Sequence, residues 1–506
     1  MQRLRELVKN NKLFAGAFGI GLLIRLLAVL GYPGALWFAG DSYVYLGAAL
    51  RPQANLSKST GYSLFLRLLL PFHSMTLVAV SQHLMGLADA VMIYALLRHN
   101  KVSKKWATIA SLPMLLDGYV IEDEHLIMTE ALFTFLLLVG LTIVLWKPRV
   151  SWRKALIVGV LVGYAAVVRT EGAIVLVIFP LFVLIRGWGW KTVSGWVSAI
   201  VMCVGILVPV GGYAAWFHSE HGTYAMTEST GFYLWGRMSS FADCARIKPT
   251  GELAEVCPTE SYKDRTAPGD FVWHAPQTHA DLNNVGGPVS SEGNSLLTKF
   301  AITAVEKQPF DYAKDVVKGI LMSFGFPRQP YPDAGTVYYY SFHGHYSGQN
   351  YDTLPPADHS WIQGGTAYAD WMTYGGEQPG VVNEIFAAPV AAYTRVFYTW
   401  GPLLAVIFLV GLGGVFSLRR RGWRPTGLRW QVRGTSMLPW ITAVGLLLFP
   451  IAAADFDYRY LIPVLPFACV AAGLAFAPGK RVPAEGIGSP AGTEQETEAA
   501  VPVPVS

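Results

Sequence analysis

Charged residues are scarce in this chain. Asp, Glu, Lys and Arg make up 14% of its 506 residues, whereas hydrophobic residues make up 52%. Soluble globular domains average about 25% charged residues. The low charge content therefore excludes an ordinary soluble protein and indicates an integral membrane protein. The basic residues sit between apolar runs rather than forming a patch with exposed aromatic residues, which argues against a nucleic-acid partner.

Cysteines are also few: the chain has four, and no two are spaced as CxxC. Cys203 and Cys469 lie in apolar runs, which is typical of inert core residues. Cys244 and Cys257 lie in a polar loop. If that loop is extracytoplasmic, a disulfide between them is expected, and two free thiols are the alternative.

Long apolar runs are what the chain has in abundance, and a membrane span needs about 20 mostly apolar residues. The first run, Leu13–Tyr32, follows four basic residues and contains Arg25. A signal peptide also begins this way, but the length of the run and its internal arginine favour a retained span. Nine further spans are predicted at about 74–97, 106–120, 126–146, 155–168, 172–186, 193–217, 388–416, 437–454 and 460–477.

The basic residues concentrate in alternate links between these runs. The basic links are 98–105, 147–154, 186–191 and 419–433. Because positively charged links remain in the cytoplasm, these links and both termini are predicted to be cytoplasmic. The other links then face outward: 33–73, 118–125, 169–171, 218–387 and 455–459.

The predicted fold is an α-helical polytopic membrane protein with about ten transmembrane helices and a large extracytoplasmic loop domain. Four parts are expected: a transmembrane catalytic module (1–217, with first outer loop 33–73), an extracytoplasmic domain (218–387), C-terminal transmembrane helices (388–477) and a disordered cytoplasmic tail (478–506). The tail is rich in Pro, Ala, Gly and Glu without apolar periodicity. Within the loop, 296–326 predicts one or two amphipathic helices broken at Pro309.

One acid lies just beyond the first span. Asp41 belongs to the stretch FAGDSYVYLGAAL (38–50), whose second half has a helical pattern. Asp41 is therefore a candidate helix N-cap. It is also a candidate general base, because partial desolvation raises a carboxylate's pKa towards the working pH and lets it accept a proton from a hydroxyl.

A second acidic stretch, YVIEDEHLIMTEALF (119–133), joins two predicted spans. Glu122 and Asp123 are interpreted as solvated loop charges. Glu130 falls one turn into the next span, and an ionised acid costs at least about 2.5–3.5 kcal/mol at the membrane centre and less near the surface. Glu130 is therefore a functional candidate, with helix-dipole stabilisation as the alternative.

Glu124 is the alternative to Glu130 as the functional acid of this stretch. Its neighbour His125 is suited to orienting a carboxylate or binding a metal. One histidine among acids is weak evidence for a metal site.

Three cations lie in links predicted to face outward, where positively charged residues are scarce: Lys58, Arg169 and Arg459. Arginine binds phosphate oxygens in a bidentate manner and lysine acts as a point charge, so all three are candidate phosphate ligands. The alternative is local ion pairing with nearby acids, namely Glu171 for Arg169 and Asp455 or Asp457 for Arg459.

At these residues the chain resembles the GT-C superfamily of polytopic glycosyltransferases, nearest to the protein-mannosyltransferase and aminoarabinose-transferase-like branch (glycosyltransferase family 39 and relatives). The resemblance covers roughly 13–217 and 388–477. The motifs that carry it are Asp41-Ser42-x-x-Tyr45, Lys58-Ser-Thr-Gly61-Tyr62, Glu124-His125-x-x-Met-Thr-Glu130, Arg169-Thr-Glu171-Gly172 and Arg459-Tyr460-Leu-Ile-Pro463.

The resemblance implies a hexosyl- or pentosyltransferase of the cytoplasmic membrane that uses a polyprenyl-phosphate sugar on the outer face, without cofactor or metal. It implies Asp41 as the base, Glu130 or its rival Glu124 as the second acid, and Lys58 as a phosphate ligand. The implied acceptor is a protein, polysaccharide or lipid. Family members often have Asp-Glu where this chain has Asp41-Ser42, and Lys-Pro-Pro where it has Lys58-Ser59-Thr60. Candidate substrate-binding residues are Lys58, Tyr62, His125, Arg169, Glu171 and Arg459.

Three alternatives remain at this point. A secondary transporter would have charged residues near mid-membrane on broken helices and two similar halves. A non-catalytic envelope assembly or binding protein would use the outer domain alone. A metal-dependent enzyme would build its site from Asp41, Glu124 and His125.

Overall fold

The computed structural model describes residues 6, 8–38, 41–279, 287–343, 366–376, 382–416 and 428–478. Over these residues the chain forms helices joined by turns, and the one β-type pairing is an isolated bridge between Leu36 and Leu126. The predicted all-helical class is confirmed for the described part of the chain. Most of the predicted tail (479–506) lies outside the described residues.

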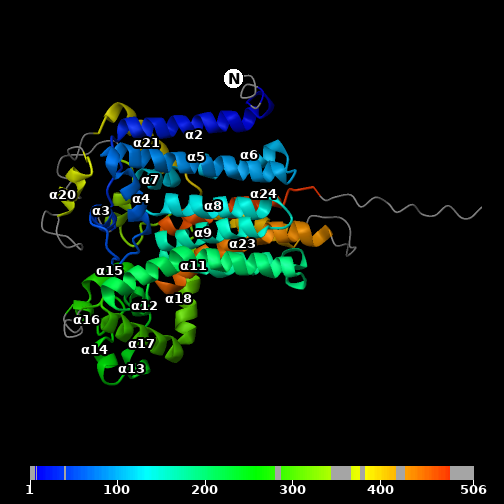
Figure 1. Cartoon of the computed structure of the whole chain (residues 1–506). Helices are drawn as coiled ribbons and strands as arrows, with labels where there is room; N and C mark the ends of the chain where they lie inside the picture. Colours follow the sequence, from blue (N-terminus) through cyan, green and yellow to red (C-terminus); the bar gives the residue numbers. More distant parts are fainter. Residues whose placement is uncertain are drawn as a thin grey trace, which may run out of the picture.

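Long helices lie side by side and make up the body of the molecule (Figure 1). They are α2 (Lys12–Gly31), α5 (Met75–His99), α6 (Lys104–Leu116), α8 (Glu130–Trp146), α9 (Trp152–Val168), α10 (Ala173–Ile185), α11 (Val193–His221), α21 (Glu384–Val396), α22 (Gly401–Val415), α23 (Leu428–Ala453) and α24 (Leu461–Leu474).

Among the described residues, four helices are long and apolar enough to cross a membrane: α2, α5, α11 and the 435–453 part of α23. A fifth span is formed if α21 and α22 count as one, although they are bent by 59° where they meet. Several other apolar helices, including α8 and α24, are shorter. The helices thus support a membrane protein with four or five spans by this criterion, and the predicted ten spans are not confirmed.

Two of the predicted spans are interrupted, each at a residue that starts a new helix. The run 106–120 stops at Leu116, because the Asp117 carboxylate accepts from the amides of Tyr119 and Val120 and caps α7 (Gly118–His125). The run 388–416 is divided between α21 and α22, where Pro402 lies in the first turn of α22. Proline lacks an amide hydrogen and is favoured at exactly this helix position.

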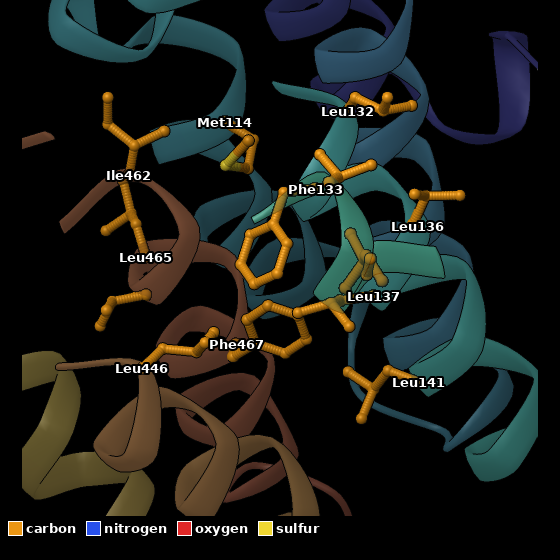
Figure 2. Packing of buried hydrophobic residues seen from close by; sticks show 14 of the residues in the cluster. Met114, Leu132, Phe133, Leu136, Leu137, Leu141, Leu446, Ile462, Leu465 and Phe467 are labelled. Carbon is orange, nitrogen blue, oxygen red and sulfur yellow. The ribbon is translucent and has the colours of Figure 1, made fainter. Parts of the chain in front are cut away.

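The helices are held together by close packing. Figure 2 shows α6, α8, α23 and α24 meeting through Met114, Phe133, Leu446 and Phe467, all of which are buried. Lipid tails are as apolar as these side chains, so inside a membrane the gain comes from van der Waals contact rather than from escaping water. Glycines allow the closest approach: a Cβ on Gly159 of α9 would lie 2.2 Å from the Met202 carbonyl oxygen of α11.

Short helices gather at one end of the long-helix bundle, on the left in Figure 1. They include α7 and, beside it, α3 (Ser42–Leu50), α4 (Gly61–Leu69), α19 (Ala334–Tyr340) and α20 (Ala367–Thr373). The described residues also contain four 3-10 turns: η1 (Leu70–Phe72), η2 (Thr170–Gly172), η3 (Arg186–Lys191) and η5 (Tyr458–Tyr460).

A separate group of helices at the lower left of Figure 1 has its own hydrophobic core, built around Trp235 and Phe300. We call it the α12–α17 cluster. It comprises α12 (Thr230–Ser239), α13 (Cys244–Ile247), α14 (Glu252–Glu255), α15 (Pro268–His274), α16 (Pro276–His279) and α17 (Ser291–Lys307). Helix α18 (Pro309–Met322) follows it after a break at Gln308, next to the predicted break at Pro309.

A disulfide joins Cys244 at the start of α13 to Cys257 after α14, within the α12–α17 cluster. It closes a loop of 13 residues. Such a link stabilises mainly by restricting the unfolded chain, by about 3 kcal/mol for a loop of this length.

We therefore expect the double substitution Cys244→Ala/Cys257→Ala to lower the stability of the α12–α17 cluster by about 3 kcal/mol. Limited proteolysis of the detergent-purified protein measures this as faster cleavage within 230–307, with the single free-thiol change Cys203→Ala as control. Unchanged cleavage of the double variant would show that the disulfide contributes nothing to the cluster's stability.

Candidate active site

A cavity of about 930 Å³ opens between the bundle, the short helices and the α12–α17 cluster. Its walls combine charged, aromatic and apolar side chains from segments far apart in the sequence. The charged residues that line it are Asp41, Lys58, Arg169, Glu171, Asp270, Asp455, Asp457 and Arg459, and its aromatic residues include Tyr45, Tyr233, Tyr340 and Tyr460.

Asp41 is one of the acids that line this cavity. It occupies the N-cap position of α3, but its side chain makes no capping hydrogen bond. Instead one carboxylate oxygen lies 2.6 Å from an Arg459 guanidinium nitrogen and the other lies 2.9 Å from Lys58 Nζ. Asp41 is only 6% exposed, so these two cations supply most of its electrostatic stabilisation.

Ser42 fixes the position of Asp41 in the loop. The Ser42 hydroxyl accepts from the Phe38 amide at 2.8 Å and donates to the Ile127 carbonyl at 3.0 Å. The loop after α2 is thereby attached to the segment between α7 and α8. The serine that stands in the acidic position of related motifs is thus a structural link in this chain.

The acidity of Asp41 differs from the sequence-based expectation. Burial raises its pKa, but the nearby charges of Lys58 and Arg459 outweigh burial and hold the pKa well below its usual range. The prediction of a raised pKa is therefore wrong for this conformation. An ion-paired carboxylate is a weak base, so Asp41 can accept a proton readily only when another anion takes over its cations.

Lys58 comes from a tight loop ahead of α4. The Asn55 side-chain oxygen accepts from the amides of Ser57 and Lys58, and this bonding shapes the turn. Gly61 sits where a Cβ would lie 2.4 Å from the Val167 carbonyl oxygen, so only glycine allows α4 to start against α9. The ammonium of Lys58 also lies 5.4 Å from the ring centre of Tyr233.

Arg459 is held from behind by an acid and by aromatic rings. Its Nε lies 3.1 Å from Asp457, whose carboxylate also accepts from the Tyr340 hydroxyl at 2.9 Å. The rings of Phe38, Tyr340 and Tyr460 lie within 6.0 Å of the guanidinium carbon. These contacts leave one face of the guanidinium towards Asp41 and the cavity.

Glu130 and Glu171 both pair with Arg169. Arg169 donates to the Glu130 carboxylate and, at 3.0 Å, to the Thr129 hydroxyl, and its Nε lies 3.3 Å from Glu171. Glu130 is fully buried and does not itself line the cavity, whereas Arg169 and Glu171 do. Glu130 therefore positions Arg169 from behind rather than contacting a ligand.

The cavity has two further walls of different character. One is apolar and lies among the bundle helices, with Leu176 of α10, Val210 of α11 and Phe449 of α23. The other belongs to the α12–α17 cluster and the segment before it, and it combines polar residues such as Thr230, Tyr233 and Asn294 with apolar ones such as Val272.

Glu124 and His125 do not line this cavity. Glu124 forms a two-pronged ion pair with Arg25 of α2, at 2.7 and 2.8 Å, and contacts His83 of α5 at 2.8 Å. His125 contacts His83 at 2.9 Å and the backbone carbonyl of Tyr32 at 3.0 Å. The geometry gives Glu124 a structural role joining α2, α5 and α7, not the predicted catalytic one, and His125 is likewise not at the substrate.

Two other predictions need correction. Glu122 and Asp123, interpreted as solvated loop charges, are buried within α7. Glu122 accepts from the Phe342 amide at 2.9 Å, and burial raises its pKa to about 7. Tyr62 is buried rather than lining the cavity: its hydroxyl donates to Gln82, and its ring packs edge-on against Tyr45, which does line it.

The predicted metal alternative is not assembled in the described part of the chain. Asp41 lies in the cavity, whereas Glu124 and His125 are engaged elsewhere. No group of three or more His, Cys, Asp or Glu residues suited to a metal ion occurs among the described residues.

Sequence reasoning missed several contributors to the site. Tyr233 lies beside Lys58, and the Gly269 amide of α15 donates to Asp455 at 3.1 Å, next to Asp457. Thr129 shares Arg169 with Glu130. Nothing in the local pattern of the 230–273 segment indicates these contacts, because they depend on how that segment folds back on the bundle.

Comparisons with known proteins give little guidance. No family model matches the chain, and no curated protein matches it. Among solved structures, it is similar to the crystal structure of the Archaeoglobus fulgidus oligosaccharyltransferase in the apo form, with a TM-score of 0.38 and 12% sequence identity. The match covers 91% of this chain and 50% of that one, so the chain spans about half of that protein's length. Similarity at this level supports no inference about activity.

The structural role of Glu124 leads to a stability prediction. The substitution Arg25→Leu leaves the Glu124 carboxylate buried without its cation, which typically costs about 3–5 kcal/mol. We expect a large fall in the melting temperature of the detergent-purified protein, partly recovered in Arg25→Leu/Glu124→Leu. A wild-type melting temperature for Arg25→Leu would contradict the structural role.

Proposed function

We propose that this chain is a membrane glycosyltransferase that moves a sugar from a polyprenyl-phosphate donor to an acceptor hydroxyl on the outer face of the cytoplasmic membrane. One observation carries the proposal: Asp41 lies between Lys58 and Arg459 in a cavity that is lined both by apolar side chains of the bundle helices and by polar side chains of the α12–α17 cluster. A lipid-linked anion and a water-soluble acceptor need this combination.

The donor's chemistry fits the cations. The phosphate of such a donor is a diester with one negative charge and two free oxygens, so it can take the place of a carboxylate beside a lysine and an arginine. The charge on the phosphate grows to that of a monoester as the sugar is transferred, so its pairing with both cations strengthens during the reaction. Lys58 and Arg459 line the cavity and have one common partner, Asp41. The polyprenyl chain would lie along the apolar wall that includes Leu176, Val210 and Phe449.

Donor binding would then activate Asp41. In the absence of another anion, Lys58 and Arg459 hold the pKa of Asp41 low, so it is a poor base. When a phosphate pairs with these cations instead, the buried Asp41 carboxylate has less positive charge around it, and the pKa of Asp41 rises. The base thus becomes competent only when the donor is present.

The reaction requires one proton transfer and one displacement. Asp41 accepts the proton of the acceptor hydroxyl as the hydroxyl oxygen bonds to the anomeric carbon of the sugar. The bond between that carbon and the phosphate oxygen breaks, and the polyprenyl phosphate leaves with the electron pair. Lys58 and Arg459 neutralise the charge that develops on the departing phosphate. A single displacement inverts the anomeric configuration.

Arg169 and the aromatic residues would complete the site. Arg169 lines the cavity but is already paired with Glu130 and Glu171. We therefore assign it a structural role, in which it neutralises these two carboxylates. Tyr45 and Tyr340 also line the cavity, and we assign them to contacts with the sugar. The acceptor would enter past the α12–α17 cluster, which contributes polar side chains to the lining.

The test compares wild type with Asp41→Asn, using purified protein, a set of polyprenyl-phosphate sugars and a crude cell-envelope acceptor. We expect wild type to release free polyprenyl phosphate and Asp41→Asn to lower kcat by about 10²–10⁴-fold, the usual contribution of a general base. Donor affinity of the variant should be equal or higher, since a carboxylate that competes with phosphate is gone.

Asp264→Asn is the matched control, because it removes one carboxylate from an exposed loop outside the cavity. It should retain wild-type release. No release by wild type with any donor would contradict the glycosyltransferase proposal, and full turnover by Asp41→Asn would contradict Asp41 as the base.

A further inference from the structure

A second cavity, of about 430 Å³, is lined by five basic residues and by no acid. The basic residues come from three separate segments: the link after α5, the link after α8 and the η3 turn. They are His99, Lys101, Lys147, Arg149 and Arg186. The positive charge of these links predicts the orientation of the chain in the membrane, and the proposed function makes no use of them.

This cavity lies at the opposite end of the bundle from the candidate active site. Helix α8 begins at Glu130, which pairs with Arg169 at the active site, and ends at Trp146, which lines the second cavity. Its 17 residues span about 25 Å at 1.5 Å per residue, close to the thickness of a bilayer core. Helix α24 likewise starts beside Arg459 and ends at Leu474 on the second cavity.

Arg186 is the most deeply placed of these cations. It is half-buried, its guanidinium donates to the Val144 carbonyl at 2.5 Å, and it lies 5.7 Å from the Phe182 ring centre. Burial lowers its pKa to about 10. Among the described residues no carboxylate pairs with Arg186, Lys147 or Arg149. A partly buried guanidinium without a counter-ion is costly unless an anion from outside neutralises it.

Other features of the cavity also favour an anion. Helix α11 is 29 residues long and begins at Val193, and Ser194 and Gly195 in its first turn line the cavity, so the positive end of its dipole faces this region. The hydroxyl of its N-cap, Thr192, is engaged with the Gly189 carbonyl and the Gly195 amide, whereas Ser194 adds a hydroxyl group to the cavity. Leu145, Val183 and Leu474 give the same cavity an apolar side.

We propose that this cavity binds a phosphate group, carried by an anionic phospholipid headgroup or free in solution. Cations from three segments, the Ser194 hydroxyl and a helix N-terminus converge on one space of suitable size. Basic pockets between membrane helices are typical sites for anionic headgroups. The apolar side, formed by helix ends, favours a lipid as the source of the phosphate. This proposal does not depend on the proposed glycosyltransferase activity.

The test uses the full chain purified in a neutral detergent, titrated separately with short-chain phosphatidylglycerol, short-chain phosphatidylcholine and inorganic phosphate. Binding is read by native mass spectrometry and by the shift in melting temperature. The variant is Lys147→Gln/Arg149→Gln, two exposed residues on the cavity rim. The matched control is Lys104→Gln/Lys105→Gln, which removes the same charge at the same end of the bundle but outside the cavity.

We expect saturable binding of phosphatidylglycerol to wild type and to the control. Each basic residue near an anionic headgroup contributes roughly fivefold in affinity, so the rim variant should bind about 25-fold more weakly. Binding of phosphatidylglycerol without inorganic phosphate would assign the cavity to a lipid headgroup, and comparable binding of both would assign it to free phosphate.

Three results would overturn the proposal. The first is the absence of saturable binding by both phosphatidylglycerol and inorganic phosphate. The second is equal binding of phosphatidylcholine, which carries no net charge and would show that the lipid tail alone is recognised. The third is an equal loss of affinity in the rim variant and the control, which would reduce the effect to overall surface charge. Equal melting temperatures of the three ligand-free proteins establish that the variants are folded.

Discussion

The ion pairs of Asp41 with Lys58 and Arg459 are the constraint on which this end of the molecule depends. A buried charge is costly unless it is paired and hydrogen-bonded. The three residues come from the loop after α2, the loop before α4 and the η5 turn, so the pairs draw together segments more than 400 positions apart in the sequence. Around them Asp457 supports Arg459, and Glu130 and Glu171 support Arg169. The cavity is lined by three cations, Lys58, Arg169 and Arg459, and by five carboxylates, so a phosphate can enter only by displacing a carboxylate from its cations.

The same physical rule gives a different outcome a short distance away. Arg25, Glu124 and His83 are also buried and paired, but they contact backbone and one another and line no cavity. Arg25 uses its remaining donors on the carbonyls of Met114 and Leu115, so α2, α5, α6 and α7 are joined at one point. Gly86 fits beside Glu124 because a Cβ there would lie 1.7 Å from its carboxylate oxygen. The Arg25–Glu124 pair is surrounded by protein groups and holds helices together, whereas the ion pairs of Asp41 face a cavity and are accessible to a ligand.

The part of the fold that depends on local pattern could be predicted. Apolar runs located the helices, and the charge bias of the links separated the two ends, so Asp41, Lys58, Arg169, Glu171 and Arg459 were all expected on one side. The predictions that failed depend on long-range contacts. Nothing near Glu124 indicates that its partner is Arg25, 99 residues away, and nothing near Asp41 indicates that two cations lower its pKa. Helix interruptions at Asp117 and Pro402 were missed because hydropathy is averaged over a window of many residues, in which the effect of one residue is lost.

A cryo-electron microscopy structure of the full chain with a polyprenyl phosphate bound tests the account most directly. We predict phosphate density within hydrogen-bond distance of both Lys58 Nζ and the Arg459 guanidinium, the lipid chain along Leu176, Val210 and Phe449, and Asp41 released from at least one of its two cations. Phosphate bound away from Lys58 and Arg459, with both Asp41 ion pairs intact, would contradict the proposed role of these residues and the activation of Asp41 by the donor.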